Sequence, residues 1–266
     1  MKFKTGVETS APKVLIYGNF GVGKSSLAAK FSRPVFIDLE GGLKFLDVTK
    51  TDHVIRKVSE VYEVLQELFV QTKGTREFDT IVIDSADWLV RLIAEQIAGI
   101  GVNDDGTQAK TMAALTQTLN KNLMDAQGGY GKAKEVLENH IRSMLLPYLQ
   151  KLNEAGYGIV LIAHQYAVST LDDEGMEMER VQPKIDPPTI GKKPIAMPAI
   201  CEWVDTILYL KKRGSDRFIQ VEGDDRAIAK NRIGKVGEYE LSEVGDISKF
   251  LAIVEKPSAE KEKKND

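Results

Sequence analysis

One short segment near the amino end constrains the fold of this chain more than any other feature. It reads Gly18-Asn19-Phe20-Gly21-Val22-Gly23-Lys24-Ser25 and fits the pattern G-x-x-x-x-G-K-[ST]. An apolar stretch at residues 13–17 predicts a buried strand before it, and residues 24–31 predict a helix after it. A glycine-rich turn in that position can point its backbone N–H groups at a phosphate. The segment therefore predicts a phosphate-binding loop in an α/β fold.

Two side chains of this loop have predicted chemical roles. We expect Lys24 to neutralise β- and γ-phosphate oxygens and the Ser25 hydroxyl to ligate Mg²⁺, with Ser26 completing the nucleotide contacts. ATP and Mg²⁺ are therefore the expected ligands. One alternative is a glycine-rich turn that only joins strand to helix. Another is a dinucleotide-binding loop, but residues 21–26 lack its third glycine and leave the Lys-Ser pair unexplained.

Two acidic residues follow predicted strands. Residues 80–84 form an apolar strand that ends in Asp84, which we expect to hold Mg²⁺ through water. The alternative is a helix cap, a role that Ser85 or Asp87 could take instead. Glu40 follows the strand at residues 34–38 and is expected at the carboxyl edge of the sheet, where it would activate the attacking water. A solvated loop carboxylate is the alternative for Glu40.

A fourth strand at residues 158–163 is followed by His164 and Gln165. A polar amide at the tip of such a strand can sense the γ-phosphate, so Gln165 is the predicted sensor. For His164 the sequence leaves open a functional role and an ordinary surface or core histidine.

The remaining pattern predicts one domain of alternating strands and helices with a mainly parallel sheet, helices on both faces and an antiparallel edge meander. The meander is expected from strands at residues 203–210, 217–221 and 227–231, and a long helix at 132–155 is expected to kink at Pro147. Residues 99–131 and 166–199 are expected to be long loops. We divide the chain into an N-terminal extension (1–12), an ATPase domain (13–255) and a disordered charged tail (256–266).

Composition excludes several classes of protein. No apolar run approaches the roughly 20 residues that span a bilayer, and residues 1–10 lack an apolar signal core, so we expect a cytoplasmic protein without a membrane contact. Cys201, the single cysteine, suits a reducing compartment and is expected to pack beside Trp203. The net charge of -3 argues against a globally basic DNA coat protein.

Five motifs together resemble one family. They are GNFGVGKSS (18–26), FIDLEGG (36–42), TIVIDSAD (80–87), LIAHQ (161–165) and AIAKNRIG (227–234). The chain resembles the RecA-like ATPases, and more closely the phage-type AAA nucleotide-binding proteins that include RecA-like single-strand annealing proteins of phages. The resemblance implies a RecA-like P-loop NTPase fold.

The same resemblance implies roles for particular residues. It implies that Glu40 is catalytic, that Gln165 is the sensor, and that the loops 99–131 and 166–199 touch single-stranded DNA. It also implies that Lys230 and Arg232 reach the γ-phosphate of a neighbouring subunit in a homo-oligomer, where such cations stabilise developing charge.

The expected function is therefore an Mg²⁺-dependent ATPase that acts on single-stranded DNA in phage recombination or replication, in the host cytoplasm. An ATP-dependent switch or assembly protein without nucleic-acid contact is the alternative, since the first half of loop 166–199 is acidic and only residues 182–193 are basic in character. A small-molecule kinase shares the phosphate loop, but it would need an acceptor pocket and a basic lid. The sequence leaves open a ring, a filament or a dimer.

Overall fold

A computed structural model of the chain describes residue 5 and residues 10–71, 76–98, 132–172, 174–186, 194–232 and 234–251. The predicted loop at residues 99–131 and the predicted tail at residues 256–266 lie outside these ranges. So does part of the predicted basic segment, at residues 187–193.

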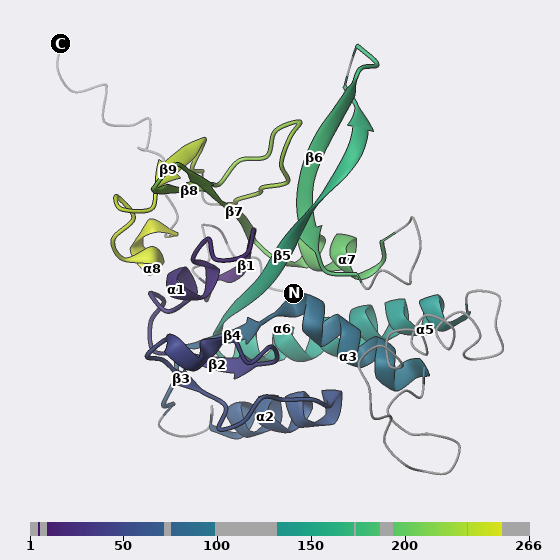
Figure 1. Cartoon of the computed structure of the whole chain (residues 1–266). Helices are drawn as coiled ribbons and strands as arrows, with labels where there is room; N and C mark the ends of the chain where they lie inside the picture. Colours follow the sequence, from purple (N-terminus) through teal and green to yellow (C-terminus); the bar gives the residue numbers. More distant parts are fainter. Residues whose placement is uncertain are drawn as a thin grey trace.

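The strands form one mixed sheet in the order β3-β2-β4-β5-β1-β7-β8-β9, with β6 paired to β5 (Figure 1). The strands from β3 to β7 in this order run parallel to their neighbours, and the pairs β7–β8, β8–β9 and β5–β6 are antiparallel. The strands are β1 (Lys13–Gly18), β2 (Pro34–Asp38), β3 (Thr49–Lys50), β4 (Thr80–Asp84), β5 (Gly158–Leu171), β6 (Glu177–Lys184), β7 (Thr206–Arg213), β8 (Asp216–Gln220) and β9 (Glu238–Glu240). The mainly parallel sheet with an antiparallel edge confirms the predicted fold class.

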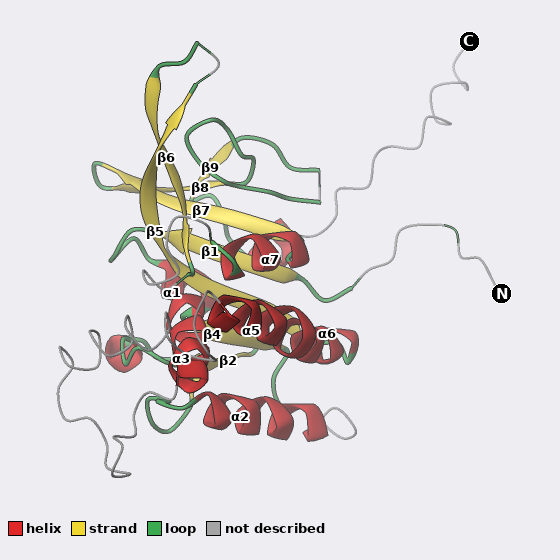
Figure 2. Cartoon of the chain, turned by 90° about the vertical axis from the view of Figure 1, so that its right-hand side faces the viewer, coloured by secondary structure: helices red, strands yellow, loops and turns green. Residues whose placement is uncertain are grey.

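Helices cover both faces of this sheet, as the sequence predicted. Their bounds are α1 (Lys24–Ala28), η1 (Leu43–Phe45), α2 (Val58–Gln71), α3 (Ala86–Ala98), α5 (Lys132–His140), η3 (Ile141–Leu145), α6 (Leu146–Glu154), α7 (Ala196–Trp203) and α8 (Ile247–Phe250). Buried residues of α2, α3, α5, η3, α6 and α7 belong to a first core cluster, and those of α1, η1 and α8 belong to a second. Figure 2 shows α5, α6 and α7 lying across the sheet.

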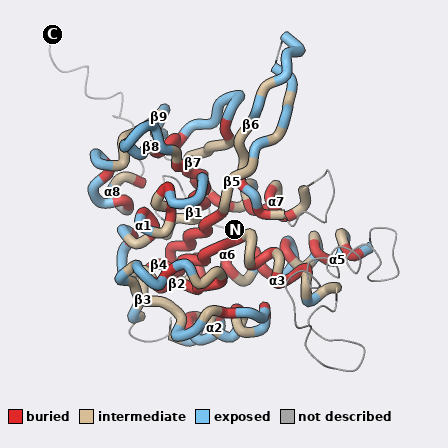
Figure 3. Tube along the Cα trace, in the orientation of Figure 1, coloured by how far each residue is buried: buried red, intermediate tan, exposed pale blue. Residues whose placement is uncertain are grey.

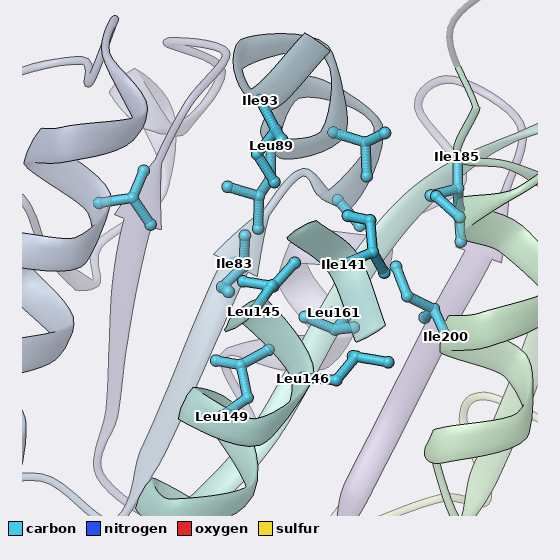
Figure 4. Packing of buried hydrophobic residues seen from close by; sticks show 14 of the residues in the cluster. Ile83, Leu89, Ile93, Ile141, Leu145, Leu146, Leu149, Leu161, Ile185 and Ile200 are labelled. Atoms are coloured by element: carbon cyan, nitrogen blue, oxygen red, sulfur yellow. The ribbon is translucent and has the colours of Figure 1, made fainter. Parts of the chain in front are cut away.

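The central strands are continuous apolar runs because both of their faces are covered. In β1, Leu15 and Tyr17 enter the first core cluster, whereas Val14 and Ile16 enter the second. Figure 4 shows the first cluster, where side chains of η3 and α6 meet side chains of β4, β5, α3 and α7. Each large aliphatic side chain buried in this way contributes roughly 1.5–3 kcal/mol.

The predicted helix at residues 132–155 is present, but it is divided by a π-helical turn. This turn, η3, directly precedes α6, which carries Pro147 in its first turn. Proline has no N–H to donate to the preceding turn, and its ring crowds the carbonyl four residues earlier. A local change of helical hydrogen bonding next to Pro147 relieves that conflict.

The prediction of a long loop at residues 166–199 is wrong for most of its length. β5 continues beyond the core to Leu171, and its outer half, from His164, pairs with β6, so residues 164–184 form a long hairpin that rises from the body (Figures 1 and 3). Its outer part is solvent-exposed (Figure 3), and its turn is fixed by Asp172, whose carboxylate accepts hydrogen bonds from the backbone N–H groups of Glu174 and Met176. The α7 helix then occupies the end of the range predicted as loop.

The antiparallel edge is present with shifted bounds. β7 starts at Thr206 because α7 continues to Trp203, which the sequence assigned to the strand. The predicted strand at residues 227–231 forms instead two isolated bridges, Val181 with Ala227 and Ile207 with Lys230. None of the helices in the described ranges has the length and apolar character that a membrane-crossing helix requires.

A candidate nucleotide site at the carboxyl edge of the sheet

The predicted phosphate loop joins β1 to α1 at the carboxyl edge of the parallel sheet. Its backbone at Gly23 has a φ of 100°, a left-handed conformation that side chains other than glycine rarely adopt. At Gly18 a Cβ atom would lie 2.3 Å from the backbone oxygen of Leu210 on β7. Glycine at these two positions therefore allows the chain to turn sharply while it stays packed against the neighbouring strand.

Lys24 is held inside this loop. Its side chain is buried, and Nζ donates hydrogen bonds to the backbone oxygens of Gly18 (3.1 Å) and Asn19 (3.0 Å). Burial lowers the pKa of this ammonium, while the carboxylates of Asp84 and Glu40 oppose that shift. The cation is thus fixed over the loop with acidic groups nearby.

Ser25 and Asp84 are brought together as the sequence predicted. The Ser25 hydroxyl donates a hydrogen bond of 2.6 Å to Asp84 Oδ2. Asp84 is only 8 % exposed, and burial raises its pKa to about 6 although the Ser25 hydrogen bond opposes the shift. A buried carboxylate is stabilised by a neighbouring cation. A hydroxyl and a carboxylate are also the hard oxygen ligands that Mg²⁺ prefers, so the pair fits the predicted metal.

Glu40 lies beside Asp84 because their strands are neighbours. Asp38, the last residue of β2, pairs with Asp84 in the parallel register. The Asp38 carboxylate accepts hydrogen bonds from the N–H groups of Glu40 (3.2 Å) and Gly41 (2.7 Å), which fixes the turn. Glu40 then accepts a hydrogen bond from the Ser85 hydroxyl. The residue after Asp84 thus orients a carboxylate that comes from a different strand.

His164 completes this acidic cluster. It pairs with Gly18 in the sheet, and its Nδ1 lies 2.9 Å from Asp87 Oδ2 and 3.5 Å from Glu40 Oε1. The Asp87 hydrogen bond raises the pKa of His164, and burial opposes it. The His164 ring also lies 4.5 Å from the ring of Phe20 in the phosphate loop. His164, for which the sequence left two interpretations open, thus contacts the phosphate loop and lies beside two carboxylates.

Gln165 occupies the opposite face of β5 from His164. Side chains alternate along a strand, and Leu161 and Ala163 belong to the first core cluster, whereas Val160 and Ile162 belong to the second together with α1. By this alternation His164 lies on the face of α1 and Gln165 on the other. The sensor role of Gln165 stays a prediction.

Lys230 and Arg232 lie at the other end of the sheet from the phosphate loop of the same chain. Lys230 Nζ donates hydrogen bonds to the backbone oxygens of Cys201, Glu202 and Val204, at 2.8, 3.2 and 2.7 Å, where α7 ends. Arg232 pairs with Asp205 at 3.3 Å, and its side chain is 62 % exposed.

Asp205 precedes Thr206, which pairs with Val14 at the start of β1. Val14 is four residues from Gly18, which corresponds to about 13 Å along a strand. Both cations therefore lie far from the phosphate loop of their own chain. Of the two, Lys230 is bound to backbone oxygens at the end of α7, whereas Arg232 pairs with a side chain.

Two residues of the site had only a possible capping role in the sequence. Ser85 and Asp87 could have capped the helix after β4, yet the Ser85 side chain contacts Glu40 and the Asp87 side chain contacts His164. Their position directly after a strand that ends in Asp84 was the available signal. Cys201, in contrast, is half-buried, and burial raises its pKa to about 12, which agrees with the predicted packing role.

A comparison with protein families gave a match that covers most of the chain. The model of the family described as an AAA domain matches residues 10–233, a range that contains the phosphate loop, both acidic strands and the Lys230–Arg232 segment. A search of curated proteins gave no match.

Proposed function

The chain belongs to the AAA domain family, and from this premise we propose that it binds ATP with Mg²⁺ and hydrolyses it to ADP and phosphate. The hydrogen bond between Ser25 and Asp84, at the foot of the phosphate loop, is the observation that carries the proposal. It joins the loop to the strand that would supply the metal ligand, so Ser25 and Asp84 would hold Mg²⁺ beside the phosphate loop.

In this proposal different residues of the site bind the phosphates and the metal. Backbone N–H groups of residues 18–25 and the Lys24 ammonium hold the phosphates, and Ser25 and Asp84 hold Mg²⁺. When bound, Mg²⁺ neutralises charge on the β- and γ-phosphate oxygens. Lys24 would exchange its hydrogen bonds to Gly18 and Asn19 for phosphate oxygens.

Glu40 is the proposed general base. Its carboxylate would take a proton from the attacking water while the new bond forms to the γ-phosphorus and the bond to the ADP oxygen breaks. Two features support this role: Ser85 fixes one oxygen of the carboxylate, and His164 lies close to the same oxygen. Gln165 is proposed to sense the γ-phosphate indirectly: a change at His164, its neighbour on β5, would be passed to Gln165 on the opposite face of this strand.

A neighbouring subunit is proposed to complete the site. Arg232 is exposed and lies far from the loop of its own chain, which suits a cation that acts on the nucleotide of another subunit in a homo-oligomer. Lys230, whose ammonium already contacts the end of α7, would act in this proposal by holding the Arg232 segment in place.

Phosphate release tests the proposed activity. We expect phosphate from ATP with Mg²⁺, none after chelation of the metal, and none from the Lys24→Ala variant. Release without any phosphorylated acceptor would exclude the kinase alternative. A wild-type chain that binds Mg-ATP and releases no phosphate in its assembled state would refute the hydrolytic half of the proposal.

Single-stranded DNA is the proposed partner of the assembled protein, because the five sequence motifs resemble those of RecA-like single-strand annealing proteins of phages. The hairpin divides by charge: Arg180 and Lys184 lie toward its base, and the acidic side chains lie toward its tip. We place the DNA contact at the base, since the acidic tip would repel phosphate.

The acidic tip is also the specific observation that favours the second candidate, an ATP-dependent assembly protein with a protein partner. Its described acidic residues are Asp172, Glu174, Glu177 and Glu179. Gel-shift titration with single- and double-stranded DNA, with and without ATP, separates the two. ATP-dependent binding at low salt supports the DNA partner, and its absence supports the assembly protein.

A further inference from the structure

A cavity of about 450 Å³ opens beside the phosphate loop on the side away from Glu40. Residues 21 and 23–27 of the loop and α1 form one wall, and Lys30, Arg217 and Leu241 form the rest. Its volume lies in the range of small-molecule sites. Lys24 and Ser25, whose roles were assigned above, line only one edge of this cavity, and the rest of it has no role so far.

The order of the strands shows which part of a nucleotide would reach this cavity. β4 and β2, which carry Asp84 and Glu40, lie on one side of β1, and β7, β8 and β9 lie on the other. The γ-phosphate must lie toward Glu40 if this residue activates water. A triphosphate bound along the loop therefore directs its nucleoside toward β8 and β9, where the cavity lies.

Packing fixes Arg217 above the loop. Ile219 of β8 belongs to the second core cluster together with Leu27 of α1, and Arg217, two residues earlier on the strand, shares the face of Ile219. The Arg217 Nε lies 3.6 Å from the position that a Cβ atom of Gly23 would occupy. The Leu241 N–H donates a hydrogen bond of 2.7 Å to the Arg217 backbone oxygen, which places both side chains at the same cavity.

The Arg217 guanidinium is available for a ligand. In the part of the chain that the structure describes, it makes no hydrogen bond or ion pair, and its residue is exposed. Arg213, on the neighbouring strand, is in contrast paired with Glu238 at 2.8 Å and lies over the ring of Phe218. A planar guanidinium stacks readily on aromatic rings.

We propose that this cavity binds the nucleoside of the nucleotide, with the Arg217 guanidinium stacked on the base and Leu241 in apolar contact beside it. The inference rests on the proposed nucleotide function and adds the nucleoside subsite to it. The lining side chains carry no carboxylate or carboxamide among the described residues, so contact with the base falls to the planar guanidinium of Arg217 and the apolar side chain of Leu241.

Calorimetric titration with two probes tests the inference, using Mg-ATP and Mg-tripolyphosphate on the full chain. Only Mg-ATP carries a nucleoside, so we expect wild type to bind it more tightly than Mg-tripolyphosphate. Arg217→Ala should weaken Mg-ATP binding about 10-fold, the range of a stacking contact, and leave tripolyphosphate binding within about twofold. Arg217→Lys keeps the positive charge but lacks the planar guanidinium, so it should lose most of the Mg-ATP affinity that Arg217→Ala loses. Arg213→Ala is the matched control and should change neither.

Every other outcome would overturn either the inference or the proposed function. If Arg217→Ala lost affinity equally for both probes, Arg217 would bind phosphate, and the inference would be overturned. The inference would also be overturned if the variant lost affinity for neither probe. Equal affinity of wild type for both probes would overturn the subsite and leave the phosphate loop intact. Failure of wild type to bind either probe would instead refute the proposed function itself. Retained tripolyphosphate binding shows that the variant is folded.

Discussion

Replacing Glu40 with Gln changes the chemistry of the site with very little change of shape. The side-chain oxygen of Gln can still accept the Ser85 hydrogen bond, so the turn after β2 and the contact with β4 should persist. An amide cannot take a proton from water. General bases contribute about 10²- to 10⁴-fold to catalysis, and at 1.36 kcal/mol for each factor of ten this is about 3–5 kcal/mol of the activation barrier.

Two measurements on Glu40→Gln separate chemistry from binding. Single-turnover phosphate release should slow about 100-fold or more, while the affinity for Mg-ATP should stay within a few-fold of wild type because Lys24, Ser25 and Asp84 are untouched. Glu67→Gln, the same replacement at an exposed position of α2, is the control and should leave both quantities unchanged.

Two results would contradict this reasoning. Wild-type turnover in Glu40→Gln would show that another group activates the water. A loss of affinity as large as the loss of rate would show that Glu40 acts in binding and not in the chemical step.

Further changes test other parts of the account. Asp79→Ala should lower the free energy of unfolding by about 1–2 kcal/mol, because Asp79 accepts hydrogen bonds from Arg33, Ser32 and Arg76. These contacts hold the pKa of Asp79 below its ordinary value of 3.8, so the difference from wild type in denaturant titrations should be full above that pH and shrink below it. Arg232→Ala should slow turnover at concentrations where subunits associate and have no effect on dilute protein, and an equal effect at both would refute action between subunits. Lys230→Met should lower the melting temperature with or without nucleotide, since it leaves carbonyls at the end of α7 without a donor.

The parallel part of the sheet could be predicted because burial on both faces leaves a clear sequence signal. β2 and β4 have the predicted bounds, and β1 and the inner half of β5 appear as continuous apolar runs. From the loop motif and the acidic residues after β2 and at the end of β4, the sequence predicted that Lys24, Ser25, Asp84 and Glu40 lie together at the carboxyl edge of the sheet.

The hairpin could not be predicted from apolar runs because neither face of its outer strands is buried in the core. From Tyr166 on, the residues of β5 alternate between half-buried and exposed, so no apolar run marks the strand. The available signal was Asp172 with Gly175, whose φ of 80° marks a turn.

The positions of individual side chains on the sheet were even harder to predict than the hairpin. His164 and Gln165 differ by one residue, and this step decides which of them faces the phosphate loop. Arg217 is a lone basic residue on an edge strand, and its place above Gly23 follows from the packing of Ile219 against α1. Contacts of this kind depend on tertiary structure and leave no local pattern.

Calorimetric titration of Mg-ATP into wild type and into Lys24→Ala tests the central claim most directly. The buried ammonium of Lys24 lies within the loop that is proposed to hold the phosphates. We predict a saturable heat with one nucleotide per chain for wild type and no measurable heat for the variant. No heat for wild type, or the same isotherm for both proteins, would contradict the assignment of residues 18–25 as a triphosphate site.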